Sequence, residues 1–337
     1  MPNRTKSRTK SHAATGLAAG VALLAAPALG QGAAGPGESV TEAWAAWAEA
    51  QGIAVTTLAV LAHGKLVAEE GIGTDAGTPR PVASLSKPIT AACAAAIPGL
   101  TSQTRVGDLL GDLLDGAGPA ADATLAQLLT HSSGIAPDST QGNPALIGVE
   151  ATMIREVAAE SLSRDPQEGT PGSYAYNNEN YALIGAMIEA ASGQSYVDAC
   201  NAALIEPLGL ATATLSGPWM GQGSWGGWQI SAADLARFAW SEYGPEGRVG
   251  ADPAARPRLE LGDGLATTEG VLTVPLPAAE SDLFWSTGLL CWGDAGDGGY
   301  FASYGNGVVV AVTFAGCIAE GDALQALDAA LFEAAAG

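Results

Sequence analysis

The order of strand-like and helix-like segments is the feature that most constrains this chain. Residues 55–62 and 66–71 are rich in apolar and β-branched residues and flank a His-Gly turn, which predicts a hairpin. Three further strands are predicted near the other end, at 283–292, 300–304 and 308–314. Between the two groups the pattern is helical. A single sheet assembled from both ends of the chain, with a helical insert, accounts for this order.

The helices are predicted from Ala-rich or amphipathic runs that stop at Gly and Pro residues. They cover 40–50, 84–97, 125–130, 181–191, 196–208, 231–240 and 321–336. The stretch 244–279 is rich in Pro and Gly, and we expect it to be a loop.

The first 30 residues have the pattern of a cleaved secretory signal. A basic head precedes an apolar run at 13–29, and Ala28-Leu29-Gly30 is a small-x-small cleavage site. A membrane anchor is the alternative, but the run is short and diluted by Ala and Gly. We therefore expect a signal peptide over 1–30, a linker over 31–40, a folded domain over 41–337, and a periplasmic or secreted protein.

The net charge of the chain limits the classes of molecule that we expect it to bind. The chain has 14 Lys and Arg against 35 Asp and Glu, a formal net charge of −21. Removing the four basic residues of the leader gives −21 − 4 = −25. Such an acidic excess repels nucleic acid and anionic lipid. We expect neither as a partner once the signal is removed, and we expect a monomer with a hydrated surface.

The chain has few histidines, which limits the metal sites and catalytic sites that it can form. The three histidines are His12 in the leader, His63 in the predicted hairpin turn, and His131. A metal cluster is therefore not expected, nor any other cofactor. No G-x-S-x-G elbow occurs, which argues against an α/β-hydrolase.

Ser84-Leu85-Ser86-Lys87 opens an apolar helical stretch and supplies a serine with a base. On a helix Lys87 would lie one turn from Ser84 on the same face, and burial would disfavour its ammonium form. A capping serine with a solvated lysine is the alternative, because S-x-x-K also occurs at 7–10. After the leader, however, only Lys65 and Lys87 remain, so a lysine in an apolar segment is notable.

Tyr176-Asn177-Asn178 offers a phenolic base and an amide, just before a predicted helix. A second Y-x-N at 304–306 falls on a probable hairpin turn and is expected to be structural.

These motifs resemble those of the serine β-lactamase and penicillin-binding-protein family, in particular its class C-like branch of esterases, D-aminopeptidases and peptidases. The resemblance covers roughly 41–337 and rests on five segments in order: 82–90, 128–134, 174–185, 206–210 and 231–238. It implies a two-lobed α+β fold of the β-lactamase/transpeptidase type. An antiparallel sheet with flanking helices would be built from 41–80 and 283–337, with a helical lobe over 81–240.

The resemblance also implies residue roles. Ser84 would attack the substrate and form an acyl-enzyme, while Lys87 and Tyr176 would share proton transfer. Asn178 would contact the substrate amide, and His131 would be a structural residue of the helical lobe.

The family's third motif, Lys-Thr-Gly or His-x-Gly on a strand, is where the chain departs. We place Asp294-Ala295-Gly296 at this motif, and expect the N–H groups of Ser84 and Asp297 to form the oxyanion hole. An acid there would repel a substrate carboxylate. The expected function is an exported serine hydrolase acting on a small ester, a D-amino acid amide or a peptide. The alternative is a non-catalytic relative that binds peptidoglycan-like ligands.

Cys93, Cys200, Cys291 and Cys317 allow two disulfides in three connectivities, with free buried thiols as the alternative. The family topology would place Cys291 early on the strand of Asp294 and Cys317 at the far end of a parallel strand. Their proximity in the sequence therefore does not imply a bridge. A Cys93–Cys200 bridge within the helical lobe is the other option that the topology offers.

Overall fold

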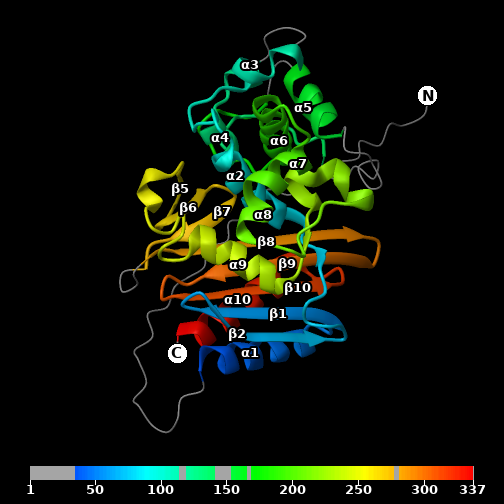
Figure 1. Cartoon of the computed structure of the whole chain (residues 1–337), viewed down its shortest axis with the longest axis vertical. Helices are drawn as coiled ribbons and strands as arrows, with labels where there is room; N and C mark the ends of the chain where they lie inside the picture. Colours follow the sequence, from blue (N-terminus) through cyan, green and yellow to red (C-terminus); the bar gives the residue numbers. More distant parts are fainter. Residues whose placement is uncertain (1–34, 114–118, 141–152, 165–167, 277–280, 337) are drawn as a thin grey trace, which may run out of the picture. The chain divides into compact units, whose positions relative to one another are not determined.

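The computed structural model of the chain describes residues 35–113, 119–140, 153–164, 168–276 and 281–336. Within these residues an eight-stranded antiparallel sheet has the order β2-β1-β10-β9-β8-β7-β6-β5 (Figure 1). The strands are β1 (Val55–Ala62), β2 (Lys65–Ile72), β5 (Leu259–Gly262), β6 (Leu265–Thr268), β7 (Val271–Val274), β8 (Leu283–Trp292), β9 (Ala295–Ser303) and β10 (Val308–Ala315).

The two ends of the chain meet in the middle of this sheet. β1 pairs with β10 along its whole length, from Val55 opposite Ala315 to Ala62 opposite Val308. Both strands are buried on both faces, which explains their nearly continuous apolar sequences. The prediction of one antiparallel sheet built from both chain ends is confirmed.

Two helices cover one face of the sheet and a third covers the other (Figure 1). α1 (Pro36–Ala50) and α10 (Glu320–Ala336) pack together over β1 and β10, where Trp47 donates a 2.8 Å hydrogen bond to the carbonyl oxygen of Ala323. α1 begins before its predicted start, with Pro36 in its first turn. α9 (Ala232–Tyr243) lies on the opposite face, below the helical lobe.

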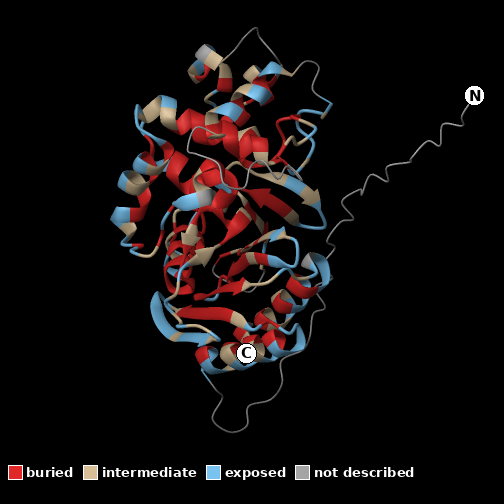
Figure 2. Ribbon diagram, turned by 90° about the vertical axis from the view of Figure 1, so that its right-hand side faces the viewer, coloured by how far each residue is buried: buried red, intermediate tan, exposed pale blue. Residues whose placement is uncertain are grey.

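The helical lobe is built around α6 (Asn178–Ser192), in which ten consecutive residues are buried. A helix that is buried all round belongs to a core, and Figure 2 shows buried residues (red) running through this lobe and the sheet. The other elements are η1 (Ala83–Leu85), α2 (Ser86–Ala96), α3 (Val106–Leu109), η2 (Gly111–Leu113), η3 (Pro119–Asp122), α4 (Leu125–Leu129), α5 (Met153–Ser163), α7 (Tyr196–Cys200), η5 (Asn201–Ile205), α8 (Glu206–Leu208), η6 (Gly217–Gln222), η7 (Gly223–Gly227) and η8 (Pro253–Ala255).

A second small sheet joins the lobes, because β3 (Arg80–Pro81) pairs with β4 (Gln229–Ile230). Among the described helices, none is both long and apolar enough to cross a bilayer.

The prediction that 244–279 is a loop is wrong. The region carries β5, β6 and β7, which extend the sheet beyond the strands read from the sequence. Each of these strands has only four residues. In the turn between β6 and β7, Glu269 forms an ion pair with Arg248, which also contacts Glu242; both carboxylate side chains are about 5% exposed.

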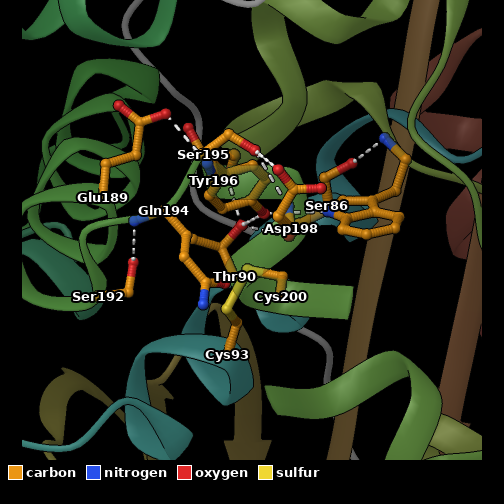
Figure 3. The surroundings of a disulfide bond; sticks show 12 residues. Ser86, Thr90, Cys93, Glu189, Ser192, Gln194, Ser195, Tyr196, Asp198 and Cys200 are labelled. Carbon is orange, nitrogen blue, oxygen red and sulfur yellow. Dashed lines mark hydrogen bonds between the residues drawn. A yellow bond between two sulfur atoms is a disulfide. The ribbon is translucent and has the colours of Figure 1, made fainter. Parts of the chain in front are cut away.

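Both pairs of cysteines are bridged. Cys93 and Cys200 link α2 to α7 (Figure 3), and Cys291 is joined to Cys317. The expected placement of Cys291 early on the strand of Asp294 is wrong, because Cys291 lies near the end of β8 and Asp294 lies in the turn that follows. β8 and β10 flank β9 and run in the same direction, so their ends meet at Gly296, which pairs with Cys291 and accepts a hydrogen bond from Gly316.

The loop lengths predict unequal contributions of the two disulfides to stability. The bridges close 107 and 26 residues, so the entropic loop model gives about 5 kcal/mol for Cys93–Cys200 and about 3.5 kcal/mol for Cys291–Cys317. Urea unfolding of the two double-Ala variants should therefore show the larger loss for the first pair. Peptide mapping without reduction should recover both linkages, and a cross-linked pair such as Cys93–Cys291 would contradict the structure.

Candidate active site

Ser84 lies at the entrance to the helical lobe, in the single turn η1 that connects β3 to α2. The residue before it, Ala83, has a left-handed backbone with φ of 47°, which is unfavourable for a residue with a side chain. Ser84 itself is half-buried. The chain thus turns sharply to present the serine at the start of the helix.

Lys87 lies one helical turn beyond Ser84 and is 2% exposed. Its Nζ is 3.0 Å from the Ser84 Oγ and donates a 2.9 Å hydrogen bond to the carbonyl oxygen of Trp225, in η7. The predicted helix and its first-turn Pro88 are both present. Burial in the apolar interior makes these polar contacts necessary for the amine.

Tyr176 reaches Ser84 from the loop before α6. Its hydroxyl donates a 2.8 Å hydrogen bond to the Ser84 Oγ, and the Lys87 Nζ lies 4.8 Å from its ring centroid. The tyrosine is 45% exposed, so this side of the serine is open to solvent. The structure therefore brings Ser84, Lys87 and Tyr176 together around one oxygen.

Asn178 begins α6, two residues after Tyr176. Its Nδ2 donates a 2.8 Å hydrogen bond to the Thr140 Oγ1, and its backbone N–H donates to Asp138. The Asn178 side chain is thus held by the 138–140 segment at the N-terminal end of α6.

The strand that faces the nucleophile is β8, at Gly288. A Cβ on Gly288 would collide with the Val82 carbonyl oxygen and would lie 2.8 Å from the Ser84 nitrogen. Ser286-Thr287-Gly288 therefore occupies the position of the Lys-Thr-Gly motif, with Ser in place of Lys. The Ser286 Oγ donates a 3.3 Å hydrogen bond to the carbonyl oxygen of Gly270. The Thr-Gly pair was a readable signal that the sequence analysis missed.

The placement of Asp294-Ala295-Gly296 at this motif is wrong. Asp294 is exposed in the turn between β8 and β9, and Gly296 lies on β9, opposite Cys291. Glycine occurs at 288 and at 296, so the sequence was compatible with either residue at the motif. Of the two, Gly288 is the one that lies against the backbone of Ser84.

Asp297 does not belong to an oxyanion hole. It lies on β9, which pairs with β8 on one side and β10 on the other, so its N–H is directed into the sheet. Its carboxylate is 3.3 Å from the Arg80 guanidinium. Burial raises the pKa of Asp297, and the neighbouring Arg80 acts in the opposite direction.

The N–H of Leu289 follows Gly288 on β8. A Cβ on Gly298, in β9, would collide with the carbonyl oxygen of Gly288, so that carbonyl is directed toward β9. In a trans peptide the next N–H points the opposite way. The N–H of Leu289 is therefore directed away from β9, one residue beyond the position at which β8 contacts η1.

A buried network of hydrogen bonds supports α2, the helix that carries Lys87 (Figure 3). The hydroxyls of Thr90 and Tyr196 are 2.6 Å apart, and the Trp228 Nε1 donates a 2.9 Å hydrogen bond to Tyr196. The Trp228 backbone N–H donates to the Ser86 Oγ at 3.0 Å. Burial raises the pKa of Tyr196 to about 12, so it stays protonated. The network fixes η7, and with it the carbonyl that Lys87 contacts.

His131 is buried next to this site. Burial, reinforced by the nearby Lys87, lowers the pKa of His131 to about 3, so the imidazole is neutral. Within the described ranges, no group of three or more His, Cys, Asp or Glu side chains is arranged to hold a metal ion.

Residues 39–322 match the sequence profile of the family described as Beta-lactamase. The chain belongs to the beta-lactamase family. In it, Ser84 lies beside the buried Lys87. Penicillin-binding protein 4 of Amycolatopsis lactamdurans is 35% identical over 112 residues, which cover 33% of this chain and 28% of that protein. The match thus spans less than a third of that relative's length.

Two solved structures illustrate the shared beta-lactamase fold. The class C beta lactamase from Rhodobacter sphaeroides superimposes with a TM-score of 0.67 at 19% identity, covering 89% of this chain and 100% of that one. The D-stereospecific amidohydrolase from Streptomyces sp. gives a TM-score of 0.66 at 19% identity, covering 88% and 98%.

The contact between β8 and η1 predicts that Gly288→Ala inactivates this family member. The new methyl group would meet backbone atoms of Val82 and Ser84, which cannot move aside without shifting the nucleophile. We expect a loss of stability of about 1–3 kcal/mol and at least a tenfold slower modification of Ser84 by a fluorophosphonate, about 1.4 kcal/mol in activation free energy. Gly321→Ala, in the open part of α10, is the control. Wild-type reactivity of Gly288→Ala would contradict the register.

Proposed function

We propose that this protein is an exported serine hydrolase that forms an acyl-enzyme on Ser84 and cleaves an ester or amide bond. The observation that carries this proposal is the convergence of the Lys87 Nζ at 3.0 Å and the Tyr176 hydroxyl at 2.8 Å on the Ser84 Oγ. A serine hydroxyl needs such a base to become a nucleophile. The distances are within reach for proton transfer in either direction.

In the proposed reaction the Ser84 Oγ attacks the substrate carbonyl carbon, and its proton passes to the Lys87–Tyr176 pair that contacts it. The negative charge that develops on the carbonyl oxygen is stabilised by the N–H groups of Ser84 and Leu289. Tyr176 then relays a proton to the leaving alcohol or amine, and the acyl-enzyme forms. Water hydrolyses it by the reverse proton path and releases a carboxylic acid.

The substrate class that we propose is a small ester, a D-amino acid amide or a peptide, with Asn178 near the substrate amide. Ser286 is neutral where the family motif has a lysine or histidine, so the site lacks one cation that would attract a substrate carboxylate. The name of the Streptomyces relative, a D-stereospecific amidohydrolase, supports the amide option. The argument for a non-catalytic protein depended on an acid beside Ser84, and Asp294 lies in an exposed turn instead.

Export is supported by two independent features. The first 30 residues have the pattern of a signal peptide. All four cysteines are paired in disulfides, which persist in oxidising compartments such as the periplasm or the extracellular space.

Covalent labelling tests the acyl-enzyme proposal. A fluorescent fluorophosphonate should label the wild-type protein on Ser84, and Ser84→Ala should abolish the label. Tyr176→Phe should slow it by about 100-fold, as expected for loss of a proton-transfer group. Ser102→Ala, at a half-buried position in a turn before α3, is a matched control that should leave labelling unchanged. Failure of the wild-type protein to react with fluorophosphonate, esters and D-amino acid amides would exclude the hydrolase.

The charge at the third motif should set the preference for anionic substrates. Ser286→Lys should accelerate acylation by benzylpenicillin, which carries a carboxylate, by about tenfold relative to a neutral ester, because a charged hydrogen bond contributes about 1.5–3 kcal/mol. Asp294→Lys adds the same cation in the exposed turn and should change this ratio by less than about twofold, since screening by solvent weakens a distant charge. A larger effect of Asp294→Lys than of Ser286→Lys would show that the assigned register is wrong.

A further inference from the structure

Tyr176 lies on a loop, so its hydroxyl can stay in contact with Ser84 only if neighbouring residues fix the loop. Residues on both sides of it are bound to His131. The Ala175 N–H donates a 2.8 Å hydrogen bond to the His131 carbonyl oxygen, and the Asn177 N–H donates a 3.2 Å hydrogen bond to the His131 Nδ1. One residue therefore fixes the backbone immediately before and immediately after Tyr176.

The imidazole ring also contacts the tyrosine directly. Its centroid is 4.6 Å from that of Tyr176 and 5.2 Å from that of Tyr181. Tyr181 is fully buried in α6, and its hydroxyl donates a 3.1 Å hydrogen bond to the carbonyl oxygen of Leu129. His131 thus lies between a fixed ring and the half-exposed ring that reaches the nucleophile.

The contacts define the protonation state that this arrangement needs. A backbone N–H can only donate, so the Nδ1 that faces Asn177 must accept, and the ring hydrogen belongs on Nε2. The amide Nδ2 of Asn180 lies 3.3 Å from the same nitrogen. A proton on Nδ1 would leave the Asn177 N–H facing a donor. Burial and the neighbouring Lys87 keep the ring neutral.

We propose that His131 is a positioning residue of the active site, whose neutral imidazole holds Tyr176 in the orientation that brings its hydroxyl to Ser84. His131 does not contact the reacting atoms in this proposal and acts only through Tyr176. The inference rests on the proposed function, because the positioned hydroxyl matters only if Ser84 is acylated.

A double-mutant cycle separates this role from a purely structural one. The readout is the rate of Ser84 acylation by a fluorophosphonate, measured for wild type, His131→Phe, Tyr176→Phe and the double variant. His131→Phe keeps an aromatic ring and loses the Nδ1 acceptor, and we expect it to slow acylation by at least about tenfold. In the Tyr176→Phe background the same substitution should have no further effect beyond about twofold.

Two more variants complete the design. His131→Asn keeps an acceptor oxygen near the Nδ1 position and tolerates the left-handed backbone of residue 131, whose φ is 54°. It should react at least about threefold faster than His131→Phe, and it replaces that variant in the cycle if His131→Phe does not fold. His63→Phe introduces the same residue at an exposed left-handed histidine, with φ of 48°, and should react like wild type.

The outcomes are distinguishable. Labelling of wild type on Ser84 together with a non-additive cycle and rescue by Asn supports the inference. Additive effects of the His131 and Tyr176 substitutions, or wild-type rates for His131→Phe, would overturn it and leave the proposed function intact. An unlabelled wild-type protein would overturn both.

Discussion

The buried amine of Lys87 is the group around which the site is arranged. An amine withdrawn from water must find polar partners inside the protein, and two of them are the Ser84 hydroxyl and the Trp225 carbonyl. Trp225 lies 138 residues beyond Lys87 in the sequence, so the geometry at Ser84 depends on η7 being held against α2. The buried hydrogen bonds of Tyr196 and Trp228 and the Cys93–Cys200 bridge do this, so that stability and nucleophile geometry share the same contacts.

The sequence alone was sufficient to predict the structure where local patterns of residue types determine it. β1, β8 and β10 are apolar runs bounded by turn residues, and their observed bounds differ from the predicted ones by at most one residue. The S-x-x-K spacing places Lys87 on the face of Ser84 because of helical periodicity. Tyr176 could be selected because only one of the two Y-x-N copies precedes a helix in the lobe, and the structure brings it to the serine.

Prediction failed where contacts between distant parts of the chain determine the structure. Which residue of β8 faces Ser84 is set by the register of β8 on β9 and by the approach of η1, and the Thr287-Gly288 pair is the one local feature that separates Gly288 from the glycines that follow it. The turn between the short strands β6 and β7 carries Glu269, which pairs with Arg248, 21 residues away, while Arg248 also contacts Glu242, 6 residues away. Composition made this region resemble a loop, because four-residue strands carry too little periodicity to detect.

The residues proposed to activate Ser84 and the residue proposed to set the substrate preference lie on different parts of the fold. Ser84 and Lys87 lie on η1 and α2, and Tyr176 on the loop before α6, whereas Ser286 lies on β8. The two groups share backbone contacts at Gly288, where β8 touches η1, and at Gly270, which lies against the backbone of Lys87 and Pro88. Because the Ser286 Oγ donates to the Gly270 carbonyl oxygen, a side-chain change at position 286 alters the charge at the site and also removes this contact. Under the proposed function, the substrate preference can thus change on the sheet side while Ser84, Lys87 and Tyr176 are kept.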